Sequence, residues 1–466
     1  MNELKHEGLK VLAVELPDEV LKYKMAGDFA GAAAAIERWL QRPVGEEMKT
    51  RLHFEQLFLR RLPEQFPFTA EQAVAEFAKL IPDFSEKDLR RVDEAGLAEW
   101  IFLNGEKHYI FNIVRNVTRV DEELARRAGT AEDEDEEKKI LKETIADIKA
   151  NKSVTWDFKV QETTRLADDL FQPGMKLKVH LPVSAELFQT SDVKVTSWSE
   201  GMSVIDPPDA PFRSICFEDT LQENREFYVE YEYTVTSEYH DFSREDYEAC
   251  LQKTQETPEA LQPYLEEQYP HIRFSPYLKS LAAEIVGDEK DPLAMARMIY
   301  DYITTKVHYS YMREYFLIPD IPQYCARNLR GDCGVQALLF ITLCRICGIP
   351  AKWQSGLYAI PGYIGPHDWA MFYVAPYGWL FADPSFGGSA YRDGDEERRK
   401  FYFGNLDPFR VTANNAFQQN FASPKQFLPV DPYDNQTGEM ESDKCGFGKD
   451  DMIQTSSILF ARRREA

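Results

Sequence analysis

The segment 333–347 constrains the fold of this chain more than any other stretch. On a helical wheel, apolar side chains cover one side of it and much of the other. Three polar residues interrupt that surface, namely Gln336, Thr342 and Arg345. A helix that is apolar nearly all round is buried, and Gly348 and Pro350 end this one. The fold must therefore pack other elements around most of its surface.

Cys333 opens this helix directly after Asp332, a residue type that caps helix N-termini well. A helix N-terminus carries partial positive charge and unpaired N–H groups, and both favour a thiolate. Cysteines at such positions can have a pKa lowered to roughly 3.5–7.5 from about 8.5. The same N–H groups can bind an oxyanion. Buried cysteines are commonly inert. The position at a helix N-terminus nevertheless makes Cys333 the candidate nucleophile among the seven cysteines.

Two residues downstream could act with this thiol. Strand-like patterns cover 352–360, 367–375 and 378–383. His367 opens the second of these segments and Asp383 ends the third. A buried Asp needs a partner, and His367 is a natural one. Cys, His and Asp in this order are the components of a thiol nucleophile with a base and an orienting acid.

The turn that joins the last two strands has two possible positions. With a turn at 374–376, His367 and Asp383 lie directly opposite each other. With a turn at 376–378, they share a face but lie about four residues out of register. The sequence does not choose between these registers.

The remaining patterns predict several domains. Residues 1–120 carry helix signals, including a capping box at Thr69–Gln72, and then a hairpin with a tight turn at Asn104-Gly105, which predicts a helical accessory domain. The acidic run 132–137 predicts an acidic helical linker over 121–154. Period-two alternation predicts a β-sandwich over 155–245.

The helical period returns from about residue 270. Ser275-Pro276 and Asp291-Pro292 both fit the start of a helix. These helices, the buried helix and the three strand-like segments predict an α+β fold. The acidic region 431–451 is rich in Gly and Asp, and we expect it to wrap the core as irregular structure.

The string GDCGVQALLFITLCRICGIPA, followed by HDW and GWLFADPS, resembles the core of the transglutaminase-like superfamily. In that family a Cys at the head of a central helix, a His before x-Trp and an Asp before Pro-Ser/Thr form a papain-like triad. The resemblance covers roughly 270–390. It implies that Cys333 is the nucleophile, His367 the general acid/base and Asp383 the orienting acid.

The resemblance also informs the domain layout. The segment 155–240 looks like the β domain that often precedes this core in bacterial members. We therefore expect a transglutaminase-like catalytic domain at 270–430 and a C-terminal extension at 431–466. The chain departs from the family at Met371, where members often have Glu. Candidates for a second oxyanion donor, besides the Cys333 N–H, are Tyr309, Tyr311, Gln323 and Asn328.

The implied activity is acyl transfer on peptide or glutamine amides through a thioester. We expect hydrolysis, as in a cysteine protease. Two alternatives stay open: protein-glutamine cross-linking by a transglutaminase, and a non-catalytic binding protein on the same fold. The implied partner is a peptide or protein substrate, and the sequence does not give the oligomeric state.

Composition argues against several other classes. The net charge of −24 disfavours nucleic acid as a partner. The sequence has neither a long apolar run nor a signal-peptide pattern at its start, so we expect no membrane association and a cytoplasmic location. We expect no cofactor and no metal. The Cys344/Cys347 pair lacks the second close pair of a typical zinc site, and no calcium-loop motif occurs.

Overall fold

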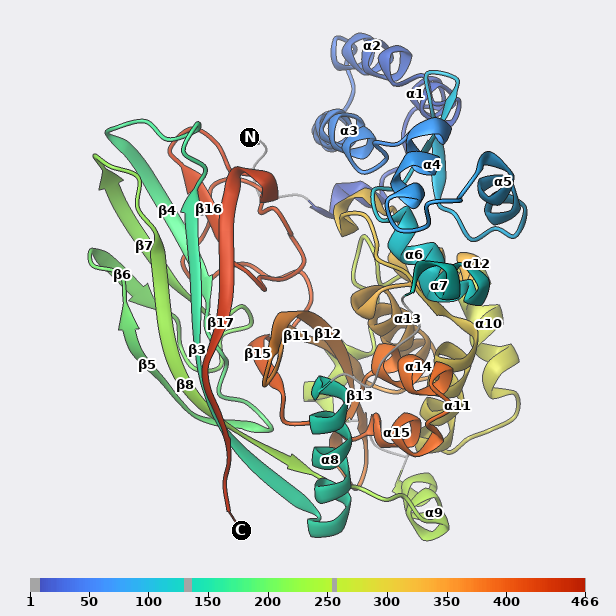
Figure 1. The fold of residues 1–466 in the computed structure, drawn as a ribbon, viewed down its shortest axis with the longest axis vertical. Coiled ribbons are helices and arrows are strands. Elements are labelled where there is room, and N and C mark those ends of the chain that lie inside the picture. Colours follow the sequence, from blue (N-terminus) through green and yellow to red (C-terminus); the bar gives the residue numbers. More distant parts are fainter. Residues whose placement is uncertain (1–8, 130–135, 254–257, 466) are drawn as a thin grey trace.

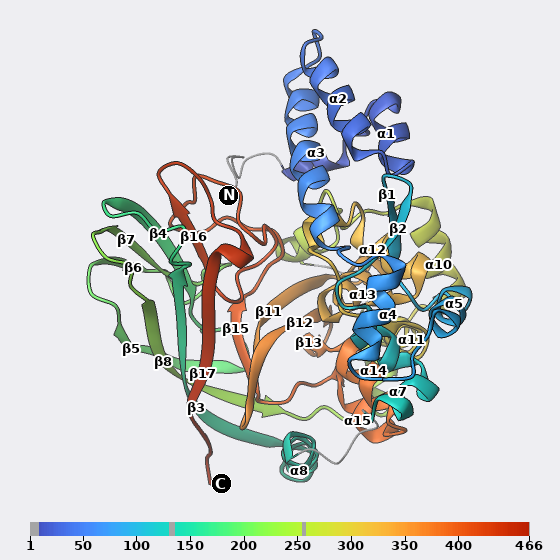
Figure 2. The same cartoon turned by 45° about the horizontal axis from the view of Figure 1, so that its top comes forward.

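The computed structural model describes residues 9–129, 136–253 and 258–465. Figure 1 shows a β-sandwich on one side of the molecule and a group of helices on the other. A further sheet, containing β11 (Ala351–Ile360), β12 (Tyr363–Val374) and β13 (Gly378–Ala382), lies between them. Figure 2 shows the first helices of the chain projecting from the rest of the molecule. The predicted mixture of helices and antiparallel sheets is therefore confirmed.

The N-terminal part is helical, as predicted. It contains η1 (Leu9–Ala13), α1 (Asp18–Met25), α2 (Phe29–Leu40), α3 (Glu46–Glu64), α4 (Ala70–Ala78), α5 (Glu86–Glu94), α6 (Ile113–Val120) and α7 (Glu122–Ala128). Thr69 and Gln72 form the predicted capping box of α4. The predicted hairpin consists of β1 (Trp100–Leu103) and β2 (Glu106–Tyr109). Asn104 and Gly105 both have positive φ, which their turn requires.

The acidic run 132–137 lies partly outside the described residues, which resume at 136. The helix α8 (Glu136–Asn151) begins there and leads into the sandwich. The linker and the other predicted domain boundaries stay predictions.

The sandwich consists of two four-stranded antiparallel sheets. One has the order β16-β4-β7-β6, formed by Glu439–Ser442, Met175–Pro182, Ser214–Leu221 and Met202–Ile205. The other has the order β17-β3-β8-β5, formed by Met452–Arg463, Ser153–Leu166, Phe227–Glu238 and Thr190–Trp198.

The C-terminal region contributes a strand to each sheet of the sandwich. We expected irregular structure over 431–451, but β16 lies in that range and η4 (Lys449–Asp451) closes it. The strand β17 follows and pairs with β3 from Leu166 to Trp156. The expectation of irregular structure is therefore wrong for β16. A sheet edge supplied by β4, more than two hundred residues earlier, satisfies its backbone groups.

The elements between the sandwich and the central helix are mostly helical. They comprise α9 (Arg244–Lys253), η2 (Glu259–Tyr264), α10 (Pro276–Val286), α11 (Pro292–Lys306), β9 (His308–Tyr309), η3 (Tyr315–Leu317), α12 (Ile321–Asn328) and β10 (Arg330–Gly331). The helices α10 and α11 begin at the predicted Ser-Pro and Asp-Pro pairs. No helix within the described residues is long and apolar enough to span a bilayer.

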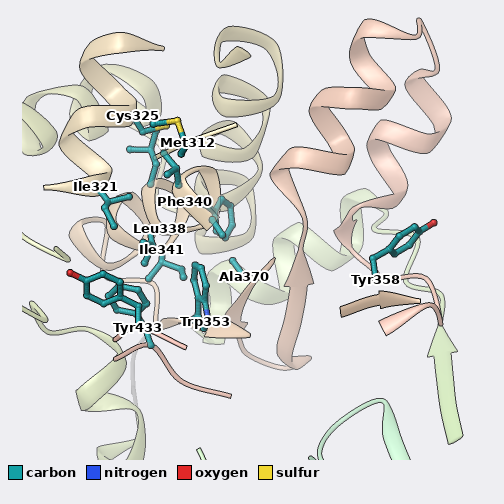
Figure 3. Close-up of a cluster of buried hydrophobic side chains, with 14 of the residues drawn as sticks. Met312, Ile321, Cys325, Leu338, Phe340, Ile341, Trp353, Tyr358, Ala370 and Tyr433 are labelled. Carbon is teal, nitrogen blue, oxygen red and sulfur yellow. The ribbon is translucent and has the colours of Figure 1, made fainter. Parts of the chain in front are cut away.

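The predicted buried helix is α13 (Cys333–Ile346), and nearly all of it is buried. It packs on an antiparallel sheet of order β14-β13-β12-β11-β15, whose outer strands are Phe403–Gly404 and Arg410–Asn414. Figure 3 shows Trp353 and Ala370 of this sheet beside Phe340 of α13. The helices α14 (Pro384–Arg392) and α15 (Glu396–Phe401) follow β13. This packing explains the apolar surface of the α13 sequence.

Candidate active site

Cys333 is the first residue of α13. The Asp332 side chain caps the helix by accepting a hydrogen bond from the Val335 N–H at 3.1 Å. The short parallel pair of β9 with β10 holds the chain as it enters the helix, with Gly331 opposite Tyr309. The thiol therefore lies where the sequence placed it, at the N-terminus of a buried helix.

His367 and Asp383 form a buried pair. His367 Nε2 lies 2.7 Å from Asp383 Oδ2, and their side chains are almost fully buried. Asp383 also caps α14 through the Phe386 N–H at 2.9 Å. Burial favours neutral imidazole and lowers the pKa of His367 despite the neighbouring carboxylate. Burial alone would raise the pKa of Asp383, but His367 and Arg410 outweigh it and lower this pKa.

Arg410 is a residue of this pair's surroundings that the sequence analysis missed. It lies 3.1 Å from Asp383 Oδ2 and 2.6 Å from Asp407 Oδ2, and all three side chains are fully buried. The rings of Tyr358, Trp369 and Phe386 surround its guanidinium. No local motif marks this arginine, because β15 approaches β11 from fifty residues later in the chain.

The observed turn agrees with neither of the two registers considered. Val374 pairs with Gly378 and Ala370 with Ala382, so the turn is centred on Pro376. By the same pairing, position 385 would lie opposite His367, two residues beyond Asp383. Asp383 lies past the end of β13 and reaches His367 from the start of α14. The pair therefore depends on the strand-to-helix junction rather than on direct cross-strand pairing.

The Cys333 thiol contacts a residue that the sequence analysis did not select. It donates a hydrogen bond to Asp368 Oδ2 at 3.2 Å. Among the described residues, no hydrogen bond joins the thiol to the His367 ring. Successive side chains of a strand point to opposite faces, and Phe372 of β12 meets Phe340 of α13. Asp368 shares that face with Phe372, whereas His367 lies on the other face with Trp369.

The expected lowering of the thiol pKa is wrong for this arrangement. Burial raises the pKa of Cys333 well above its usual value, and the nearby Asp368 and Asp332 carboxyls add to the rise. The backbone amide of Asp368 acts in the opposite direction without reversing it. The helix N-terminus is present, but it acts on a thiol that is only 9% exposed.

Buried carboxyl groups surround Asp368. Burial raises the pKa of Asp368 to about 8, and the charge of Asp332 contributes. Burial also raises the pKa of Asp332 to about 6, and it raises those of Asp431 and Asp434 well above the usual range. Gln436 donates to Asp368 Oδ1 at 2.5 Å. The segment 431–436 therefore contributes to the surroundings of the thiol. The sequence analysis missed this contribution because the segment lies about a hundred residues after Cys333 in the chain.

Gly334 makes the approach of Asp368 to the helix possible. A Cβ at this position would lie 2.7 Å from both Asp368 Oδ2 and Trp353 Cη2, and it would collide with the Tyr315 hydroxyl. Real Cβ atoms essentially never lie so close to other atoms. The three groups therefore converge on a space that only glycine leaves open.

Replacing Gly334 with alanine should destabilise the protein by about 1–3 kcal/mol through overpacking. The measurement is the urea unfolding midpoint of Gly334→Ala beside Gly388→Ala. Gly388 is also helical, but its Cβ would meet only ordinary contacts, so this control should be neutral or stabilising by up to about 1 kcal/mol. Equal midpoints for the two variants would contradict the tight convergence at Gly334.

The candidates for a second oxyanion donor lie in different places. Tyr309 precedes the helix on β9, and burial raises its pKa well above the usual value, with a further contribution from the charge of Cys333. Tyr311 bonds through its backbone to Asn116 of α6, at 3.0 Å and 2.7 Å. Asn328 bonds to the Tyr324 carbonyl, and the Gln323 N–H bonds to Asp320. Tyr309 is thus the candidate whose pKa the nearby Cys333 affects.

The structure also shows where Met371 and the Cys344/Cys347 pair lie. Met371 is fully buried in β12, where it pairs with Lys352 of β11 and Phe381 of β13. Cys344 and Cys347 are free thiols in and just after α13. Within the described ranges, no group of three His, Cys, Asp or Glu side chains is arranged to hold a metal ion. The expectation of no metal and no cofactor stays a prediction.

Residues 279–384 match the family model of the transglutaminase-like superfamily. The matched region contains Cys333, His367 and Asp383, and it confirms the resemblance seen in the sequence. The match supports a cysteine-dependent activity and implies peptide or protein substrates. No curated protein matches the chain.

Two solved structures share parts of the fold. One is titled "The Crystal Structure of a Putative Cysteine Protease from Cytophaga hutchinsonii"; it is 14% identical, with a TM-score of 0.40, over 66% of this chain and 91% of that chain. The other is the periplasmic domain of TgpA from Pseudomonas aeruginosa, 13% identical, with a TM-score of 0.30, over 55% of this chain and 95% of that chain. The structural similarity is too low for residue roles to be assigned from these two proteins.

Proposed function

We propose that this protein cleaves peptide or glutamine amides through a Cys333 thioester, with water as the final acceptor. The observation that carries the proposal is the buried His367–Asp383 pair, in which His367 lies on β12 next to the residue that contacts the Cys333 thiol. Imidazole oriented by a carboxylate is the base that a thiol nucleophile needs. The family match over 279–384 supports the same assignment.

The first half of the reaction would form the thioester. Because His367 Nε2 faces Asp383, Nδ1 is the ring nitrogen left to take the thiol proton. The Cys333 sulfur then attacks the amide carbonyl carbon, and a C–S bond forms. The N–H groups at the head of α13 stabilise the oxyanion. His367 returns the proton to the leaving nitrogen as the C–N bond breaks, and the amine departs.

The second half would release the product. A water molecule gives a proton to His367 Nδ1 and attacks the thioester carbon. The C–S bond breaks, the carboxylic acid leaves, and the proton returns to the Cys333 sulfur. A primary amine in place of water would give transamidation by the same steps. Throughout, Asp383 stays ionised and stabilises the imidazolium.

The geometry requires a rearrangement before the first step. Cys333 is 9% exposed and His367 5% exposed, and the thiol bonds to Asp368. The sulfur must leave Asp368 and meet His367 when substrate enters. This same contact favours one alternative, a non-catalytic protein that binds peptides on the family fold.

The test compares two products made by the wild-type protein. Glutamine-containing peptides are incubated with the protein and a labelled primary amine, with Cys333→Ala as the blank. We expect cleaved or deamidated peptide to predominate, as mass spectrometry will show. A predominance of labelled amide would mean cross-linking instead. The absence of both products, with retained peptide binding, would establish the binding protein.

A further inference from the structure

We propose that Asp368 is a positioning residue for the nucleophile, which holds the Cys333 thiol protonated and away from His367 in the resting protein. The inference rests on the proposed role of Cys333. Its direct support is the hydrogen bond from the Cys333 sulfur to Asp368 Oδ2 at 3.2 Å. Asp368 and His367 are neighbours on β12 and point to opposite faces. A thiol bonded to Asp368 is therefore on the other face of the strand from the His367 ring.

This contact is built into the fold. The Asp368 carboxyl, the Trp353 ring and the Tyr315 hydroxyl converge on Gly334, where a Cβ would lie too close to all three. Tyr315 in turn donates to Asp332 Oδ1 at 2.6 Å, which ties the carboxyl of the helix cap to the same cluster. Asp368 is only 5% exposed. A side chain so enclosed holds one position, and the hydrogen bond to the thiol follows from that position.

Groups from several elements face the Asp368 carboxyl. Gln436 donates to its second oxygen at 2.5 Å and fixes the direction of the carboxyl plane. The titratable groups around it are Cys333 and Asp332 at the head of α13, Tyr315 of η3, and Asp431 and Asp434 of the C-terminal segment. Burial, followed by the charge of Asp332, opposes ionisation of Asp368, and the hydrogen bonds with Cys333 and Asp434 offset only part of this effect. The surroundings therefore favour the neutral form of the carboxyl.

The charge of Asp368 decides its effect on the thiol. An ionised carboxylate beside the sulfur repels a thiolate, whereas a neutral carboxyl does not. Burial raises the pKa of Asp368 to about 8, with a further contribution from Asp332. The repulsion is therefore small well below this pH and grows as the pH rises through it. Asp368 therefore opposes the ionisation of the Cys333 thiol most strongly in alkaline solution, where its own carboxyl is ionised.

The test measures alkylation of Cys333 by iodoacetamide in the intact protein, followed by mass spectrometry of the labelled peptide. Asp368→Asn removes the charge and keeps an oxygen that accepts from the thiol. Its rate should match that of wild type at about pH 6.5. At about pH 9 its rate should exceed that of wild type about tenfold, which is the change in thiolate when the pKa of the thiol falls by one unit. If reagent does not reach the thiol, the ultraviolet absorbance of the thiolate, corrected with Cys333→Ser counterparts, gives the same comparison.

A second variant acts from the C-terminal segment. Gln436→Ala removes a donor that stabilises the ionised Asp368, so its alkylation at alkaline pH should also exceed that of wild type. The matched control is Asp206→Asn in the sandwich, a buried carboxyl with a raised pKa that bonds to Ser214. It should follow wild type at both pH values.

Two results would overturn the proposal. A rate ratio between Asp368→Asn and wild type that stays the same at both pH values would mean a purely structural carboxyl. Slower labelling of Asp368→Asn than of wild type in alkaline solution would mean that Asp368 instead acts as the base that accepts the Cys333 proton. Neither outcome depends on substrate, so an inactive wild-type protein would reject the proposed function while leaving this test decisive.

Discussion

Replacing Cys333 with alanine is expected to reduce amide cleavage by about 10⁴-fold or more, because loss of a nucleophile leaves only binding and oxyanion stabilisation. The residue begins a helix whose N-cap is the Asp332 side chain, and alanine is compatible with that position. The fold should therefore survive the change. Initial rates of peptide cleavage and of amine incorporation measure the effect, and circular dichroism reports the fold.

The matched control for this prediction is Cys344→Ala. Cys344 lies in the same helix and is fully buried, but it has no partner in the proposed chemistry. Its removal should change stability rather than the rate per folded molecule. Cleavage that persists in Cys333→Ala, or that falls equally in both variants, would refute the assignment of Cys333 as nucleophile.

Replacing Arg410 with methionine is expected to cost about 3–5 kcal/mol of stability, because it leaves buried carboxylates without their cation. Asp383 and Asp407 both contact the guanidinium, and none of the three side chains is exposed. Methionine keeps much of the volume among the surrounding rings, so the loss of charge dominates. Urea unfolding gives the free energy of unfolding of each variant.

The control is Arg225→Met, which removes a partly exposed ion pair with Asp219 at 2.8 Å. Pairs of that kind contribute about 0–1 kcal/mol. Adding Asp407→Asn to Arg410→Met should recover part of the loss, since one unpaired charge disappears. A cost for Arg410→Met as small as that for the control would show that the buried carboxylates do not need this cation.

The sandwich supports the strand that carries Arg410. The Ala185 N–H donates to the Thr412 carbonyl at 2.6 Å, and the Arg213 N–H donates to the Ala413 carbonyl at 3.0 Å. These bonds join the chain between β4 and β7 of the sandwich to β15 of the central sheet. A change that destabilises the sandwich should therefore also disturb β15, and with it the contact of Arg410 with the His367–Asp383 pair. The β domain thus has a physical connection to the candidate site.

Local patterns in the sequence determined the helix that carries Cys333, the strands around it and the caps of α10 and α11. These features depend on residues within one or two turns of each other, and their hydrophobic period or capping chemistry is visible in the chain. The combination of Cys333, His367 and Asp383 also followed from motifs. The His367–Asp383 contact itself forms through the start of α14, a junction that neither predicted register contained.

Only the tertiary structure decided which groups face the thiol. Asp368 lies beside His367 in the sequence, but the packing of α13 on one face of β12 gave it the contact with Cys333. Arg410 and Gln436 reach the site from later segments, through sheet pairing and loop contacts that no short-range pattern encodes. Burial then reversed the expected effect of the helix N-terminus on the thiol, because desolvation depends on everything packed around a group.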